Sequence, residues 1–167
     1  MVLKHNQTLS DLRDNHAFTG ELSWIGLRPA HQGAMVMPGE ATLIENKGLK
    51  GDHMANGSSK KRQVTLIQVE HLAVISKLIN KNSISAENLR RNLVIEGINL
   101  LALRDRQFTI GDCILQGTGH CHPCSRMEEA LGEGGYNAMR GHGGITAIVI
   151  QGGAIKIGDM VRSLPET

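Results

Sequence analysis

The chain has 167 residues, of which 40% are hydrophobic and 2% aromatic, and its formal net charge is +2 at pH 7. This length predicts one domain with one substantial core, built from aliphatic side chains rather than rings. The small net charge argues against duplex binding by bulk electrostatics, and the scarcity of rings argues against stacking of single-stranded bases. We therefore expect no nucleic-acid partner.

The first residues are polar and include Lys4, His5 and Gln7, so they lack the apolar core of a signal peptide. We predict a cytoplasmic protein with no membrane partner. The three cysteines are too few for a disulfide framework in a chain of this length, so reduced thiols are expected. Residues 1–18 are predicted to form a frayed or loosely docked tail, followed by one domain over residues 19–167.

The first part of the domain is predicted to contain several strands separated by loops rich in Gly and Pro. Four segments fit strands, with the alternation of apolar and polar residues clearest in the first and third; they are residues 19–27, 41–46, 63–69 and 92–96. Leu72, Ile75 and Leu78 form an apolar stripe that predicts a helix over 70–78. Ser85 is a favourable N-cap, so a short helix through Leu89 is also expected.

The rest of the chain is also predicted to consist mainly of short strands separated by turns. Two short extended pieces are predicted within residues 108–117, around a turn at Gly111, and a helix over residues 125–131. The end of the chain predicts three strands joined by glycine turns, over residues 145–150, 154–157 and 160–164. Short strands outnumber helices, which predicts a mainly β fold, a β-barrel or closed sheet with a few peripheral α-helices, rather than alternating βαβ units.

Four residues that bind metals or do redox chemistry fall within one short segment: His120, Cys121, His122 and Cys124. The segment follows an apolar strand and precedes the helix predicted over residues 125–131. A thiol at a helix N-terminus is close to unpaired backbone N–H groups, which favour the thiolate. A thiolate is the ligand that a soft metal prefers.

The spacing alone leaves four interpretations open. A dithiol oxidoreductase would need a βαβ context and a later cis-proline, yet the only proline after Cys124 is Pro165. Structural zinc would need a second ligand pair, and His142 is the only obvious donor. Inert buried cysteine is the expected state of Cys113, which lies within an apolar strand. The fourth interpretation is a metal cofactor held by the single thiolate of Cys124.

Several ordered motifs favour the fourth interpretation. Together they resemble the MOSC family, named after the C-terminal domain of molybdenum cofactor sulfurases, from about Glu21 to Val161. The motifs lie at residues 48–53, 62–67, 90–94, 119–128, 134–146 and 152–159. The resemblance implies the β-barrel-like MOSC fold for the domain over residues 19–167. One departure is Ile148, where small stand-alone members often have an arginine.

The resemblance also implies a chemistry. In similar MOSC reductases the second cysteine of the pair binds molybdenum, which assigns the metal ligand to Cys124 and leaves Cys121 without a required role. The implied cofactor is the molybdenum cofactor in its molybdopterin form, and the implied activity is reduction of small N-hydroxylated substrates. The chain has no ferredoxin, haem, flavin or nicotinamide motif, so a separate electron-donating reductase is expected. The alternative is a carrier of persulfide sulfur or of the cofactor, without redox turnover.

A cofactor with a phosphate needs cationic side chains and backbone N–H donors around it. Arg90, Arg91 and Asn92 match the family's Arg-x-Asn pattern and are predicted to bind it, although a paired arginine is otherwise often a solvated helix end. Arg62, next to a strand, is a second candidate for the phosphate or the pterin. Thr65 lies in the same motif and is included in the predicted pocket.

Four further residues complete the predicted site. Asp52 is expected to accept hydrogen bonds from the pterin, although capping of the turn after Gly51 is equally compatible with the sequence. Gly143 and Gly144 would let the backbone approach the cofactor closely. His142, between these glycines and Gly141, is the predicted catalytic proton donor beside Cys124, with a purely structural turn as its alternative.

Overall fold

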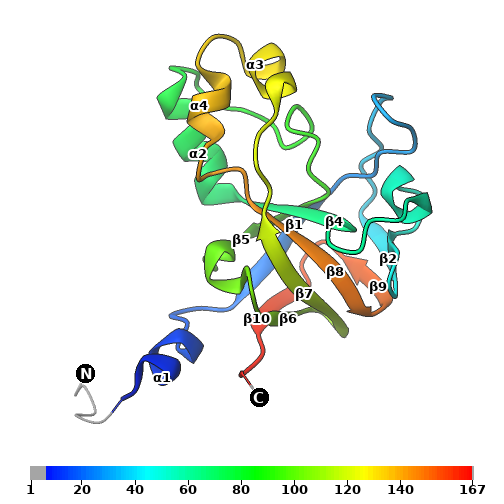
Figure 1. Cartoon of the computed structure of the whole chain (residues 1–167), viewed down its shortest axis with the longest axis vertical. Helices are drawn as coiled ribbons and strands as arrows, with labels where there is room; N and C mark the ends of the chain where they lie inside the picture. Colours follow the sequence, from blue (N-terminus) through cyan, green and yellow to red (C-terminus); the bar gives the residue numbers. More distant parts are fainter. Residues whose placement is uncertain (1–6, 167) are drawn as a thin grey trace.

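The computed structural model describes residues 7–166. Seven strands form a closed barrel in which every neighbouring pair is antiparallel except β4 and β5 (Figure 1). This confirms the predicted mainly β class. Around the barrel the strands are β1 (Gly20–Ile25), β10 (Met160–Ser163), β6 (Gln107–Ile110), β7 (Cys113–His120), β8 (Ile145–Gln151), β4 (Val64–Gln68) and β5 (Leu93–Glu96).

A second, three-stranded sheet lies beside the barrel, with β2 between its two neighbours. The strand β9 follows β8 directly in the chain, so this sheet extends from one edge of the barrel wall. Its strands are β2 (Glu40–Ile44), β3 (Gly48–Leu49) and β9 (Gly153–Lys156).

The helix α2 (Val69–Leu78) connects the parallel strands β4 and β5. This is one βαβ unit inside a mostly antiparallel barrel, and the sequence pattern did not anticipate it. The pair Cys121 and Cys124 lies elsewhere, between β7 and the helix α3 (Ser125–Leu131), which the sequence predicted over the same residues. The context that a thioredoxin-type dithiol requires is therefore absent around these cysteines.

Two apolar clusters hold the fold together. The first fills the barrel with alternate, fully buried residues of its strands, among them Leu22, Phe108 and Val149. The second lies outside the barrel wall, where Ile67 of β4 packs beneath the helices with residues such as Met127. The helices α2, α3 and α4 (Gly135–Met139) are thereby gathered at one end of the barrel (Figure 1).

Two local predictions differ from the structure. The helix expected from Ser85 to Leu89 is wrong: Ser85 Oγ accepts the backbone N–H of Asn88, but the segment is only a hydrogen-bonded turn. The chain reverses at Arg90, which has a φ of 53°, and enters β5 before a helix can form. The helix α4 was not predicted, and two short 3-10 helices occur at His53–Asn56 and Leu100–Leu103.

The described part of the predicted tail contains the helix α1 (Leu9–Asp14), which the sequence analysis did not predict. A capping box between Thr8 and Asp11 begins this helix, and none of its residues is buried. Arg106 attaches its end to the domain, donating to the carbonyl of Arg13 and pairing with the carboxylate of Asp14. Residues 1–6 of the tail lie outside the described residues. Within residues 7–166 no helix has the length and apolarity needed to span a bilayer.

Candidate functional site

Three loops meet at the helical end of the barrel: residues 89–92, 121–124 and 140–144. The guanidinium of Arg91 joins them, with Nε donating to the Gly143 carbonyl at 2.9 Å, Nη1 to the Leu89 carbonyl at 2.8 Å and Nη2 to the Cys121 carbonyl at 3.5 Å. Arg91 is 4% exposed, and this burial lowers its pKa. Arg91 was predicted to bind the cofactor, and in the structure its guanidinium positions the three loops.

Gly143 and Gly144 are required by the packing of these loops. A Cβ atom on Gly143 would lie 2.4 Å from the Cys121 carbonyl oxygen, and one on Gly144 would lie 1.8 Å from the Leu66 carbonyl oxygen. Gly144 also has a φ of +87°, which side-chain-bearing residues rarely adopt. These glycines are therefore required for close contact between backbone segments, whatever ligand approaches them from the cavity that they line.

Asp52 is 2% exposed and its carboxylate is filled by donors from the chain itself. Oδ2 accepts from the backbone N–H and Nε of Arg28 and from Asn92 Nδ2, while Oδ1 accepts from Arg28 Nη2 and the Met54 N–H. Burial would raise the pKa of Asp52, but the hydrogen bonds and charge of Arg28 outweigh it and lower that pKa. The prediction of a pterin contact has no support here. The alternative, capping of a turn, is what the structure shows.

Asn92 and Thr65 extend the same buried network. Asn92 Oδ1 accepts from Arg28 Nη2 at 2.8 Å and from the Thr65 N–H at 3.1 Å. The Asn92 N–H donates to Thr65 Oγ1 at 3.1 Å, and Asn92 is 0% exposed. These two predicted cofactor contacts are therefore internal ones that join β4, β5 and the Arg28 segment. Arg28 itself was missed, because nothing in its local sequence distinguishes it from a surface arginine.

The two cysteines of the pair have opposite environments. Cys124 is exposed and occupies the N-cap of α3, directly before the helix that the sequence predicted over residues 125–131. Cys121 is 1% exposed, and its Sγ lies 3.6 Å from Nη2 of Arg62. Arg62 is itself exposed just before β4, so the structure brings this predicted residue to the cysteine loop. Cys113 is buried in β7, as predicted.

On one side of Cys124 lies a cavity of ≈ 590 Å³, called here the Arg90 cavity. Arg90 Nη1 donates to the Gly33 carbonyl at 2.7 Å, whereas its Nη2 is buried and has no partner among the described residues. Burial and the charges of Arg28 and Arg126 lower the pKa of Arg90. The cavity is lined mainly by polar and cationic residues, including Gln32, Asn88, Arg90, Ser125, Arg126 and Glu129.

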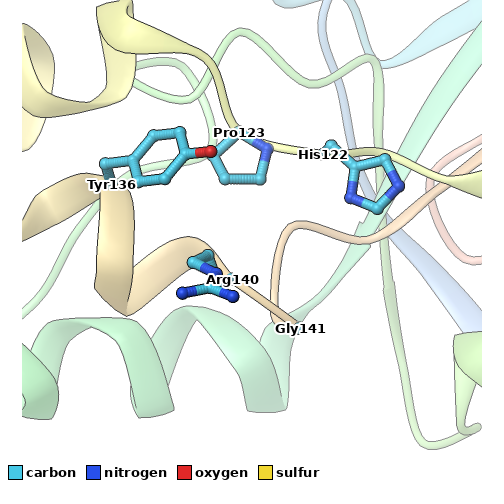
Figure 2. A pocket seen from close by; sticks show the side chains of 5 residues that line it. All are labelled: His122, Pro123, Tyr136, Arg140 and Gly141. Carbon is cyan, nitrogen blue, oxygen red and sulfur yellow. The ribbon is translucent and has the colours of Figure 1, made fainter.

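On the other side lies a cavity of ≈ 490 Å³, called here the Tyr136 cavity (Figure 2). It is lined by His122, Pro123, Tyr136, Arg140 and Gly141. A smaller cavity of ≈ 130 Å³ shares three of these residues and extends inward to His120, Cys121, Gly143 and Gly144. Pro123 lines the Tyr136 cavity and Ser125 the Arg90 cavity, so Cys124 is flanked in the chain by residues of both cavities, although it is not among the lining residues of either.

His120 and His122 lie close together at this point, with ring centroids 5.5 Å apart. His120 Nε2 is 2.8 Å from Arg104 Nη1. Because a guanidinium can only donate, His120 Nε2 is the acceptor in this contact. The sequence analysis considered both histidines only as members of a cluster, and it did not distinguish them by role.

His142 has a different position from the predicted one. Its Nδ1 is 3.0 Å from the Ala138 carbonyl oxygen of α4, and its ring lies 5.2 Å from that of His71 on α2. His142 is not among the residues that line either cavity or the inner extension. The structure therefore gives His142 the structural role at the turn that the sequence left as the alternative.

No group of three or more His, Cys, Asp or Glu side chains within the described range could hold a metal ion. This removes the support for a zinc site of the kind that the sequence left open, with His142 as the distant donor. A cofactor that brings its own ligands and needs one protein thiolate places no such demand on the chain.

The sequence model of the MOSC domain matches residues 50–162. The chain belongs to the MOSC domain family. This match covers the barrel strands from β4 to β10, both cysteines of the pair and the residues that line the two cavities, apart from Gln32. No curated protein matches the chain significantly.

Solved structures share the fold at low sequence identity. The YuaD protein of Bacillus subtilis has a TM-score of 0.75 at 17% identity, covering 86% of this chain and 94% of its own. YiiM of Escherichia coli has a TM-score of 0.66 at 16% identity, covering 88% and 71%. YiiM of Geobacillus stearothermophilus has a TM-score of 0.64 at 13% identity, covering 87% and 75%. At these identities the likeness establishes the MOSC fold.

Proposed function

We propose that this MOSC protein binds the molybdenum cofactor through the thiolate of Cys124 and reduces small N-hydroxylated compounds. The observation that carries the proposal is the position of Cys124, an exposed thiol in a MOSC fold whose two neighbours in the chain, Pro123 and Ser125, line separate cavities. A cytoplasmic location suits this role, because a reducing compartment keeps such a thiol free.

The residues around the Arg90 cavity fit an anionic cofactor in its molybdopterin form. Nη2 of Arg90 is a buried donor without a partner, and such a donor costs free energy unless a ligand accepts from it. Arg126 adds a second cation and Asn88 an amide on the same wall. A phosphate group would accept from these donors, so Arg90, Arg126 and Asn88 are the residues proposed to hold it.

The proposed thiolate ligand is held by its neighbours. Arg91 fixes the loop of Cys121 against Gly143, and α3 begins directly after Cys124. When bound, the cofactor supplies a metal centre that accepts an oxygen atom from the substrate and cycles through two electrons. The chain contributes the thiolate, the phosphate contacts and the cavity beside the metal position.

Electrons are proposed to come from a separate reductase. The chain has three cysteines, and none of the motifs that hold an iron–sulfur cluster, haem, flavin or nicotinamide. The exposed face around Cys124 is the region that such a partner would have to approach, because electron transfer requires a short distance to the metal.

A second candidate is favoured by the same exposed thiol. Cys124 is accessible enough to accept a sulfane sulfur as a persulfide and to pass it on, without a bound metal. Alternatively, the protein could carry the assembled cofactor to another enzyme without turnover.

The reductase proposal is tested by turnover of benzamidoxime with a reduced viologen dye as the electron donor. The protein is purified from a host that makes the cofactor, as wild type, Cys124→Ser and Cys121→Ser. We expect amidine formation by the wild type, near-complete loss in Cys124→Ser, and substantial activity in Cys121→Ser. Absence of turnover together with a trappable persulfide on Cys124 would favour the carrier instead.

A further inference from the structure

We propose that the Tyr136 cavity is the substrate site and that Arg140 makes it selective for flat substrates carrying an anionic group. This inference rests on the proposed reductase function, since it names the substrate class of that site. A carboxylate or phosphate on an aromatic N-hydroxylated compound has the chemistry that the cavity would recognise.

The cavity has the right position for a substrate. Its wall includes His122 and Pro123, the two residues immediately before Cys124. The Arg90 cavity, assigned above to the cofactor phosphate, begins at Ser125 on the opposite side. A cofactor held from one side of Cys124 leaves the Tyr136 cavity as the space from which a second molecule reaches the metal position.

The cavity offers flat faces. Tyr136 is the single tyrosine of the chain, and it is 42% exposed. Figure 2 shows its ring, the ring of Pro123 and the imidazole of His122 around the same hollow. Exposed rings of this kind stack on planar ligands and lose little conformational entropy in doing so. A planar substrate is therefore the best match for this surface.

The charge of the cavity is positive and uncompensated. Arg140 is exposed and lines the hollow, and no acidic residue is among the residues that line it. The ion pairs within residues 7–166 use Arg28, His53, Arg104 and Arg106, so Arg140 has no carboxylate partner there.

The nearby carboxylate of Glu128 is committed elsewhere. Its two oxygens accept the backbone N–H groups of Gly134 and Tyr136, each at 2.8 Å. These bonds lower the pKa of Glu128 and keep it ionised at the start of α4. Glu128 therefore orients the helix that carries Tyr136 and leaves Arg140 free for a ligand.

The helix α4 holds Tyr136 and Arg140 in a fixed relation. Tyr136 lies within α4, and Arg140 is the C-cap residue directly after it, where the backbone turns extended (φ −61°, ψ 122°). Between them Ala138 and Met139 are buried in the apolar cluster beneath the helices. A Cβ on Gly135 would lie 2.5 Å from that of Leu131, so α4 is packed closely against α3.

The first experiment compares benzamidoxime with para-carboxybenzamidoxime as substrates of the holoenzyme. We expect the carboxylated compound to have a KM about tenfold lower, the size of one charge-assisted hydrogen bond. Arg140→Gln should abolish that preference. Arg162→Gln, an exposed arginine on β10, is the matched control and should keep the preference. A preference that survives Arg140→Gln would overturn the proposal.

The second experiment needs neither metal nor turnover. Benzamide and para-carbamoylbenzoate, which are not reduced, are titrated into the protein without cofactor, and backbone amide shifts are followed by NMR. We expect para-carbamoylbenzoate to shift the amide signals of Tyr136 and Gly141 in the wild type and in Arg162→Gln. Its affinity for Arg140→Gln should be about tenfold lower. Shifts centred elsewhere would contradict the site. Arg140-dependent binding without any reductase activity would retain the site and reject the reductase function.

Discussion

Cys121 and Cys124 show how residues of one type, three positions apart, acquire different chemistry. Cys121 is enclosed by the loop contacts of Arg91, lies against Arg62 and lines the small inner cavity. Cys124 is exposed, and its neighbours in the chain line the two larger cavities. The assignment of the metal to Cys124 came from resemblance, and the exposure of its thiol now supports it independently.

Several predicted site residues proved to be structural for a common reason. Asp52, Thr65 and Asn92 satisfy one another and Arg28 below the surface. A sequence shows that a polar residue recurs in a motif, but it does not show whether the partner is a ligand or another buried side chain. Arg90 is a predicted site residue whose Nη2 is buried without a hydrogen-bond partner among residues 7–166.

The buried ion pair gives a prediction about stability. Asp52→Ala should destabilise the protein by about 3–5 kcal/mol, because Arg28 and Asn92 lose their acceptor inside the protein. Urea unfolding measures this. Asp105→Ala is the control, since Asp105 forms a pair with Arg104 that is largely exposed, and the change there should stay below about 1 kcal/mol. Equal effects in the two variants would contradict the assigned role of Asp52.

The pH dependence of the stability that this pair contributes follows from the direction in which the pKa of Asp52 is shifted. The pKa of Asp52 is lowered in the folded protein, so the stabilisation is present above the unfolded pKa of about 3.9. It is lost as the pH falls through the folded pKa. The difference in unfolding free energy between wild type and Asp52→Ala should therefore shrink in acid and stay constant near neutral pH.

At the scale of elements, the short apolar runs between turn residues predicted the barrel strands well. Alternation was a weaker guide, because β4 is buried along its whole length and β5 over most of its length. The helix α3 was also predicted, whereas α4 was missed because its segment is short and rich in glycine. The β-branched and aliphatic runs could not reveal that β4 and β5 are parallel. That arrangement depends on α2 packing back on the barrel, which is a tertiary property.

The glycine loop before β8 gives a prediction at this scale. Gly144→Ala should destabilise the protein by more than about 2 kcal/mol, because the new methyl would collide with the Leu66 carbonyl in addition to the strained φ. Gly158→Ala is the matched control: its φ is +97°, but no atom lies within 4 Å of the added methyl. It should cost only about 1 kcal/mol, as backbone strain alone does. Thermal unfolding measures the loss of stability in each variant. Similar losses in the two would show that the structure relieves the collision at position 144, against the prediction.

For the whole molecule, the fold and the family followed from ordered motifs, and the structure then divided the predicted site into two parts. One part is a buried scaffold around Arg28, Arg91 and Asn92. The other is a surface with Cys124 and two cationic cavities lined by its neighbours in the chain. The second part could not be predicted in full, because Arg140 joins His122 and Pro123 in one cavity, and Arg126 joins Arg90 in the other, only after the chain has folded.

The central claim is that one thiolate, that of Cys124, holds the molybdenum cofactor. It is tested most directly by the molybdenum content of the protein purified from a host that makes the cofactor. We expect close to one molybdenum per chain in the wild type and in Cys121→Ser, and almost none in Cys124→Ser, with all three folded by circular dichroism. Molybdenum retained in Cys124→Ser, or lost only in Cys121→Ser, would contradict it.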